Sequence, residues 1–215
     1  MSEQPASEKA VALFREQGGI LGTSEALDLG IDSRTLYALR DAGILEQLAQ
    51  GLYRLADLPP LSNPDLVIVA HKIPRGVICL VSALAYHELT TQIPHAVDLA
   101  LESGSRRPQL TFPPLRVFWF SGPAWSEGVE VRQIDSTSVR IYSPEKSVAD
   151  AFKFRRRLGL DLAIEALQAY RGRPDFDVDR LLHYVRICRV EQVISPYLEA
   201  PLYLQTSPPL STKGC

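Results

Sequence analysis

Residues 23–55 read TSEALDLGIDSRTLYALRDAGILEQLAQGLYRL, and this stretch decides how the N-terminal part of the chain folds. Its first two residues, a threonine and a serine, are good N-caps for a short helix. Gly30 ends that helix because glycine adopts the left-handed conformation of a tight turn. Asp32 and Ser33 then cap a second helix over residues 34–42. The two helices with a glycine between them predict a helix-turn-helix.

The flanking residues complete this pattern on both sides. Residues 7–19 place apolar side chains three and four positions apart, which predicts a preceding helix with one buried face. Residues 44–48 and 52–55 are short alternating runs on either side of Gly51, which predicts a hairpin. Three helices followed by a hairpin are typical of a winged helix-turn-helix, whose second paired helix enters the major groove of DNA.

This prediction supplies candidate DNA-binding residues. The candidates are Ser33, Arg34, Thr35, Tyr37 and Arg40 on the second helix and Arg54 on the hairpin. Residues 1–58 carry five positive and nine negative side chains, a net charge of −4 that opposes phosphate binding. A winged helix used for protein contacts without DNA therefore stays open as an alternative.

The rest of the chain predicts a second, α+β domain. A proline-rich linker over residues 59–64 separates the winged helix of residues 1–58 from a domain at residues 65–200, and residues 201–215 read as a flexible tail. Within the second domain, several short strands form a small antiparallel or mixed sheet, and three helices follow it.

Two helix boundaries in this domain follow from capping residues. Ser82 is expected to cap a helix over residues 83–89. Ser143, followed by Pro144 at the first helical position, is expected to start a helix that runs to Leu158.

Three segments resemble one known family. They are GLYRL at residues 51–55, SALAYHELT at 82–90 and YSPEKSVAD at 142–150, and their order makes the chain similar to the AbiEi antitoxins of type IV toxin–antitoxin systems. The resemblance implies a winged helix that binds operator DNA and represses its own operon, in a phage-defence setting. It also implies a C-terminal domain that opposes a nucleotidyltransferase toxin of the AbiEii type, without a stable complex, without enzyme activity and without a cofactor.

A second basic cluster lies far from the winged helix. It consists of Lys153, Arg155, Arg156 and Arg157. On one continuous helix, the first, third and fourth of these would share a face. They could contact DNA phosphates or an acidic partner, and the alternative is a solvated surface.

Other candidate sites are weaker. Tyr86, His87 and Glu88 could hold a ligand, although the leucines beside them favour a packed helix. Asp98 and Glu102 could belong to a nuclease-like metal site, but no third ligand can be identified.

Composition limits the remaining classes of function. The 23 Lys and Arg and 25 Asp and Glu give a net charge of −2, which excludes a uniformly basic nucleic-acid coat. No apolar run is long enough to span a membrane, and neither a phosphate-binding glycine loop nor a paired-histidine zinc motif occurs. The three cysteines make no metal or disulfide pattern, and no secretory signal is visible, so we expect a cytoplasmic protein.

Overall fold

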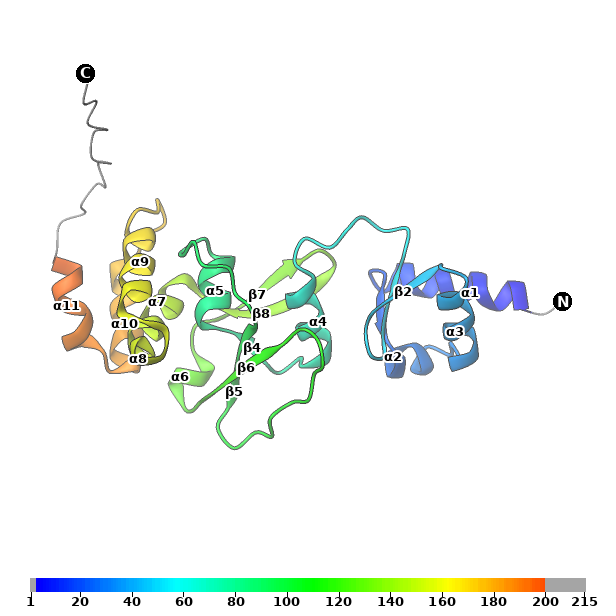
Figure 1. Cartoon of the computed structure of the whole chain (residues 1–215), viewed down its shortest axis with the longest axis horizontal. Helices are drawn as coiled ribbons and strands as arrows, with labels where there is room; N and C mark the ends of the chain where they lie inside the picture. The colour runs from blue at the N-terminus through cyan, green and yellow to red at the C-terminus, as the bar shows by residue number, and fades with distance from the viewer. Residues whose placement is uncertain (1–2, 200–215) are drawn as a thin grey trace, which may run out of the picture.

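The computed structural model describes residues 3–199, which fold into two separate sheets with helices around each (Figure 1). The fold is α+β, as predicted. In Figure 1 the N-terminal helices lie at the right, the second sheet lies in the middle and the C-terminal helices lie at the left. The predicted tail at residues 201–215 lies outside the described residues.

The N-terminal segment is a winged helix-turn-helix. Its elements are α1 (Glu3–Glu16), β1 (Ile20–Gly22), α2 (Thr23–Asp28), α3 (Ser33–Asp41), β2 (Leu45–Ala49) and β3 (Leu52–Leu55). The strands form an antiparallel sheet in the order β1-β3-β2, with Leu45 paired to Leu55 across the hairpin. Phe14, Ala26 and Leu36 are fully buried between this sheet and the helices. The predicted order of helices and hairpin is therefore confirmed.

The two helix starts in this segment have different caps. The Oδ1 atom of Asp32 accepts a hydrogen bond from the Thr35 N–H at 2.9 Å, so the predicted cap of α3 is confirmed. The predicted cap of α2 is wrong, because the cap residue is Gly22. The Glu25 carboxylate accepts the Gly22 N–H at 2.7 Å and satisfies the terminus in place of a hydroxyl.

The second sheet is mixed. Its strands are β4 (Val77–Ile78), β5 (Val97–Glu102), β6 (Leu115–Phe120), β7 (Val129–Ile134) and β8 (Thr137–Tyr142), in the spatial order β6-β5-β4-β8-β7. The pairs β4·β8 and β5·β6 are parallel, and the pairs β4·β5 and β7·β8 are antiparallel.

Helices precede, interrupt and follow this sheet. Those before and within it are α4 (Pro64–Lys72), α5 (Leu80–Tyr86) and α6 (Pro123–Ser126). Those after it are α7 (Pro144–Lys153), α8 (Arg155–Leu158), α9 (Leu160–Arg171), α10 (Val178–Cys188) and α11 (Glu191–Glu199). Helix α7 packs against α5, α9 and α10, and its residues from Pro144 to Phe152 are all buried.

Two predicted boundaries in this part of the chain are wrong. Helix α5 starts at Leu80, and Ser82 lies within it. The Ser82 hydroxyl accepts the Asp98 N–H at 2.9 Å, so it joins α5 to β5 rather than capping a helix. Helix α7 is capped by Ser143 as predicted, but it ends at Lys153, and α8 begins after Phe154.

The N-terminal segment packs against the second sheet. Ile20 and Leu52 belong to the same buried cluster as Val67 and Ile141. Polar contacts surround this cluster. They are the Ser62 N–H to Asp135 Oδ2 at 3.1 Å, Lys72 Nζ to the Gln50 carbonyl at 2.5 Å, and His71 Nε2 with Thr137 Oγ1 at 3.1 Å.

A buried ion pair lies at the centre of the C-terminal helices. Lys146 Nζ donates to Asp150 Oδ2 at 2.5 Å, and both side chains are fully buried. The ammonium group also lies over the Tyr142 ring, 4.2 Å from its centroid, and Cys188 Sγ donates to Asp150 Oδ1 at 3.2 Å. Each charge therefore has a partner inside the core.

Because a buried charge without its partner is costly, we expect Lys146→Met to reduce the free energy of unfolding by about 3–5 kcal/mol. The double variant Lys146→Met/Asp150→Leu removes both charges and should be more stable than Lys146→Met alone. Urea unfolding followed by circular dichroism measures both values. A double variant as unstable as the single one would show that the pair is not the source of the loss.

Candidate functional site

Helix α3 separates its apolar residues from its polar ones. Leu36 and Leu39 are buried in the N-terminal core, whereas Arg34 is exposed and Tyr37 is 47% exposed. Ser33, Thr35 and Arg40 are half-buried along the same helix. The helix thus turns a polar surface outward, as a helix that reads a DNA groove must do.

Neighbouring acids hold several of these side chains in place. The Thr35 hydroxyl donates to Asp32 Oδ2 at 2.9 Å, and the hydrogen bonds from Thr35 lower the pKa of Asp32. Arg40 donates to Asp41 Oδ1 at 2.7 Å, and its guanidinium lies 5.2 Å from the centroid of the Tyr37 ring. Tyr37 and Arg40 therefore form one continuous surface.

Arg54, the candidate DNA-binding residue of the hairpin, has a buried side chain. Its side chain is only 6% exposed and is paired with Glu46 Oε1 at 2.6 Å. A second guanidinium nitrogen donates to the Pro59 carbonyl. Arg54 thus joins the hairpin to the start of the following segment, and its positive charge is paired with Glu46 within the protein.

The basic residues near the end of α7 lie on two helices instead of one. Phe154 interrupts the helix, so the shared helical face expected for Lys153, Arg156 and Arg157 does not form. Lys153 and Arg157 still gather on one side, because their charged groups lie over the rings of Phe120 and Phe118 respectively.

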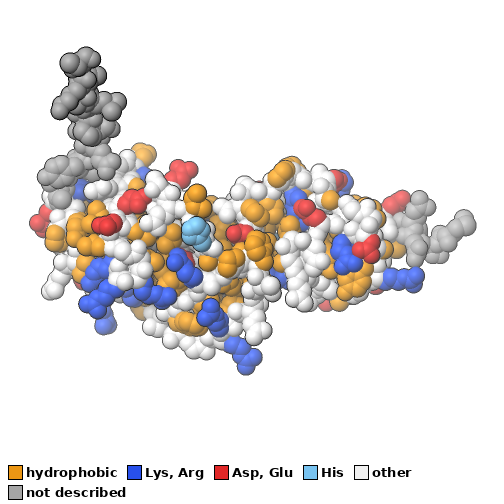
Figure 2. Space-filling model, viewed as in Figure 1, with side chains coloured by type: hydrophobic (Ala, Val, Ile, Leu, Met, Phe, Trp, Pro, Cys, Tyr) orange, Lys and Arg blue, Asp and Glu red, His pale blue; other side chains and the backbone are white. Residues whose placement is uncertain are grey.

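The other basic residues near the end of α7 differ in their contacts and exposure. Arg155 donates to the Phe152 carbonyl at 2.9 Å, and Arg156 is exposed. Arg186 and Arg189, at the end of α10, line a pocket together with Lys153. Figure 2 shows Lys and Arg side chains concentrated over the region of α8 and α10. Sequence spacing does not connect Arg186 and Arg189 with this cluster, because both lie far from α7 along the chain.

The residues Tyr86, His87 and Glu88 do not converge on a cavity. His87 is buried, and its Nε2 atom donates to the Tyr142 carbonyl at 2.7 Å. Leu84 and Leu89 on either side are in the C-terminal core. This arrangement favours the packed helix over a ligand site.

The Asp98 carboxylate is occupied by protein groups. Arg116 donates to both of its oxygens, at 2.6 and 2.8 Å, and the Val81 N–H donates to Oδ2 at 3.0 Å. Glu102 lies four residues along the same strand, about 13 Å away at the usual rise per residue. These two acids do not share a metal ion, which argues against the nuclease-like alternative.

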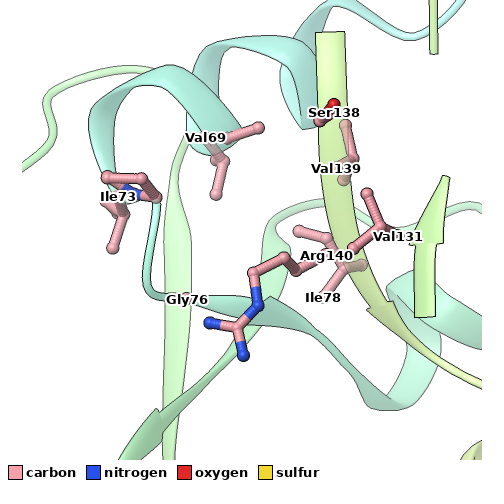
Figure 3. Close-up of a pocket in the computed structure, with 10 residues that line it drawn as sticks. Val69, Ile73, Gly76, Ile78, Val131, Ser138, Val139 and Arg140 are labelled. Carbon is pink, nitrogen blue, oxygen red and sulfur yellow. The ribbon is translucent and has the colours of Figure 1, made fainter. Parts of the chain in front are cut away.

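Figure 3 shows a groove of about 280 Å³ between α4 and the β7–β8 pair, with Val69, Val131 and Val139 on its walls. Arg140 crosses it and donates to the Arg75 carbonyl at 2.7 Å. Within residues 3–199 there is no group of three or more His, Cys, Asp or Glu that could hold a metal ion, and no helix could span a membrane.

Comparisons with known proteins agree with this geometry. Residues 8–56 match the family described as "Transcriptional regulator, AbiEi antitoxin", which confirms the resemblance for α1 through β3. Among solved structures, the chain is similar to the RV2827C protein from Mycobacterium tuberculosis, with a TM-score of 0.51 and 17% sequence identity. The alignment covers 85% of this chain and 76% of that one, and at this identity it shows a shared fold. No curated protein matches the sequence.

Two histidines with lowered pKa values, the half-buried His71 and the buried His87, predict how stability changes with pH. Burial lowers the pKa of both His71 and His87. Below the unfolded-state pKa of about 6.5, the unfolded chain binds protons that the folded chain does not. The free energy of unfolding should therefore fall between pH 7 and pH 5, by at most about 1.4 kcal/mol per pH unit for each histidine.

Urea unfolding at pH 7 and pH 5 tests this expectation. His87→Gln keeps an N–H donor for the Tyr142 carbonyl but does not titrate, so it should reduce the fall in stability. His95→Gln, at an exposed position, is the matched control. An unchanged pH dependence in His87→Gln would contradict the role given to His87.

Proposed function

We propose that this chain, whose residues 8–56 belong to the AbiEi family of antitoxin transcriptional regulators, binds the operator DNA of its own operon through α3. The observation that carries the proposal is the outward surface of α3, formed by Arg34, Tyr37 and Arg40 opposite the buried Leu36 and Leu39. Ser33 and Thr35, in the first turn, complete that surface. Arg54 is left out because its side chain is buried.

The positive side chains of α3 favour it over the rest of the N-terminal segment as the DNA-binding surface. Residues 1–58 have a net charge of −4, so most of this surface repels phosphate. Asp41 offsets part of the charge of Arg40, and it can release that arginine because both side chains are at the surface. The basic cluster of Lys153, Arg155, Arg156 and Arg157 supplies a second positive surface for DNA or an acidic partner.

The second part of the proposal concerns the toxin. By the resemblance of the segments at 82–90 and 142–150, residues 65–200 oppose a nucleotidyltransferase toxin of the AbiEii type in a type IV system, without a stable complex. Residues 59–64 serve as the connection between the two activities. In support, residues 77–142 form a sheet of their own, which shares no strand with the N-terminal sheet.

The arginines of α3 give the first test. Arg34→Ala and Arg40→Ala should each weaken binding to the operator, measured by fluorescence anisotropy with a promoter fragment at several salt concentrations. If the arginine contacts a phosphate, its replacement by alanine should reduce the slope of log K against log salt by about one unit. If the arginine contacts a guanine, its replacement by alanine should reduce the discrimination between bases at one base pair by about 1–3 kcal/mol.

A matched control is Arg15→Ala, which removes an exposed arginine of α1 that pairs with Asp57. It should bind DNA like the parent protein. If both α3 variants also bind like the parent, α3 is not the DNA-binding surface.

The division of labour gives the second test. The full-length double variant Arg34→Ala/Arg40→Ala should lose repression of a promoter reporter and still protect cells that express the cognate toxin. The folded state of the variant is checked by circular dichroism and thermal unfolding. Loss of both activities in a folded variant would show that protection depends on DNA binding and would refute the division.

A further inference from the structure

A pocket of about 650 Å³ opens at the end of β6, between the ends of α7 and α10. Its size is within the range of pockets that hold small organic ligands. Three positive side chains line it: Lys153 from α7, and Arg186 and Arg189 from the end of α10. No acidic side chain lines it. Segments far apart in the sequence thus bring three cations around one hollow.

These cations are available to a ligand. In the part of the chain that the structure describes, the side chains of Lys153, Arg186 and Arg189 make no ion pair and no hydrogen bond, and all three residues are exposed. Asp150 contacts Cys188, which lines the pocket, and it accepts hydrogen bonds from Lys146 at 2.5 Å and from Cys188 at 3.2 Å. Its negative charge is balanced within the core.

The helix C-termini beside the pocket cancel only part of the positive charge of these three side chains. Lys153 lies at the C-terminus of α7, and the two arginines lie at the C-terminus of α10. Each helix end is equivalent to about half a negative charge, so two ends offset about one of the three cations. A net charge of about +2 remains for a bound anion.

Arg189 has a backbone conformation that its residue type disfavours. Its φ is 57° and its ψ is 49°, at a helix end where glycine is the usual residue. The hydrogen bonds from Arg189 N to Arg186 O and from Val190 N to Val185 O close the turn without help from the side chain. An arginine at this strained position fits a role for its charge.

Non-polar residues also line the pocket, and Pro123 and Ile187 are the largest of them. Ser121, directly after β6, lines it as well. A ligand that suits this lining carries several negative charges together with a poorly hydrated group.

We propose that this pocket binds a free nucleoside polyphosphate. The phosphates face Lys153, Arg186 and Arg189, and the base lies against Pro123 and Ile187. Because the side chains of Pro123 and Ile187 form no hydrogen bonds with a base, the site accepts different bases with similar affinity. This binding is independent of the operator-binding surface on α3.

The test uses full-length protein and isothermal titration calorimetry with ATP, GTP, adenosine and inorganic pyrophosphate. ATP and GTP should bind with similar affinity, pyrophosphate more weakly, and adenosine not measurably. Arg186→Ala and Arg189→Gly should each weaken ATP binding about tenfold, the usual effect of losing one charged hydrogen bond.

Arg189→Gly separates binding from folding. Glycine relieves the positive φ, so the thermal midpoint should stay the same or rise while ATP affinity falls. Arg132→Ala is the matched control, because Arg132 is an exposed arginine on β7, at the edge of the sheet opposite β6. It should bind ATP like the parent protein.

Three outcomes would overturn the proposal. They are no ATP binding by the parent protein at millimolar concentration, ATP binding that Arg186→Ala and Arg189→Gly leave unchanged, and displacement of ATP by a single-stranded oligonucleotide at lower concentration than by GTP. The last result would assign the pocket to a nucleic-acid strand.

Discussion

Strand β3 is buried on both faces, and this double burial joins the N-terminal segment to the rest of the molecule. Tyr53 and Leu55 pack into the core of the winged helix, whereas Leu52 packs into the core of the second sheet. Because side chains alternate between the two faces of a strand, the short strand β3 contributes side chains to both cores. Arg54 shares the face of Leu52, and it is held there by Glu46 and the Pro59 carbonyl.

The same burial sets the position of the wing. The turn after β2 lies against α4, where Lys72 donates to the Gln50 carbonyl, and a Cβ atom on Gly18 would lie 2.9 Å from the Cβ atom of Ser136. Much of the β2–β3 hairpin thus contacts other parts of the protein. The proposed DNA surface depends on α3 for this reason, and the wing contributes less to it than a free wing would.

The positive surfaces of the molecule have different origins. The surface of α3 comes from one short stretch of sequence, in which the three-residue spacing of Leu36 and Leu39 decides which helix face is buried and which faces out. The cations around the end of β6 come from two helices that meet only because α7 packs against α10. A buried ion pair, Lys146 with Asp150, lies at that contact and is backed by Cys188.

The sequence by itself determined the order of elements in the N-terminal segment and some of the helix boundaries. Helix spacing, the Asp32 cap and the glycine turns predicted the winged helix, and Ser143-Pro144 predicted the start of α7. These signals act between residues a few positions apart, so they can be read without the fold. Only the tertiary structure decided that Arg54 is buried, that Arg116 occupies Asp98 and that Arg186 and Arg189 join Lys153. Exposure and ion pairing depend on which distant segments cover a side chain, and composition and spacing carry no information about that.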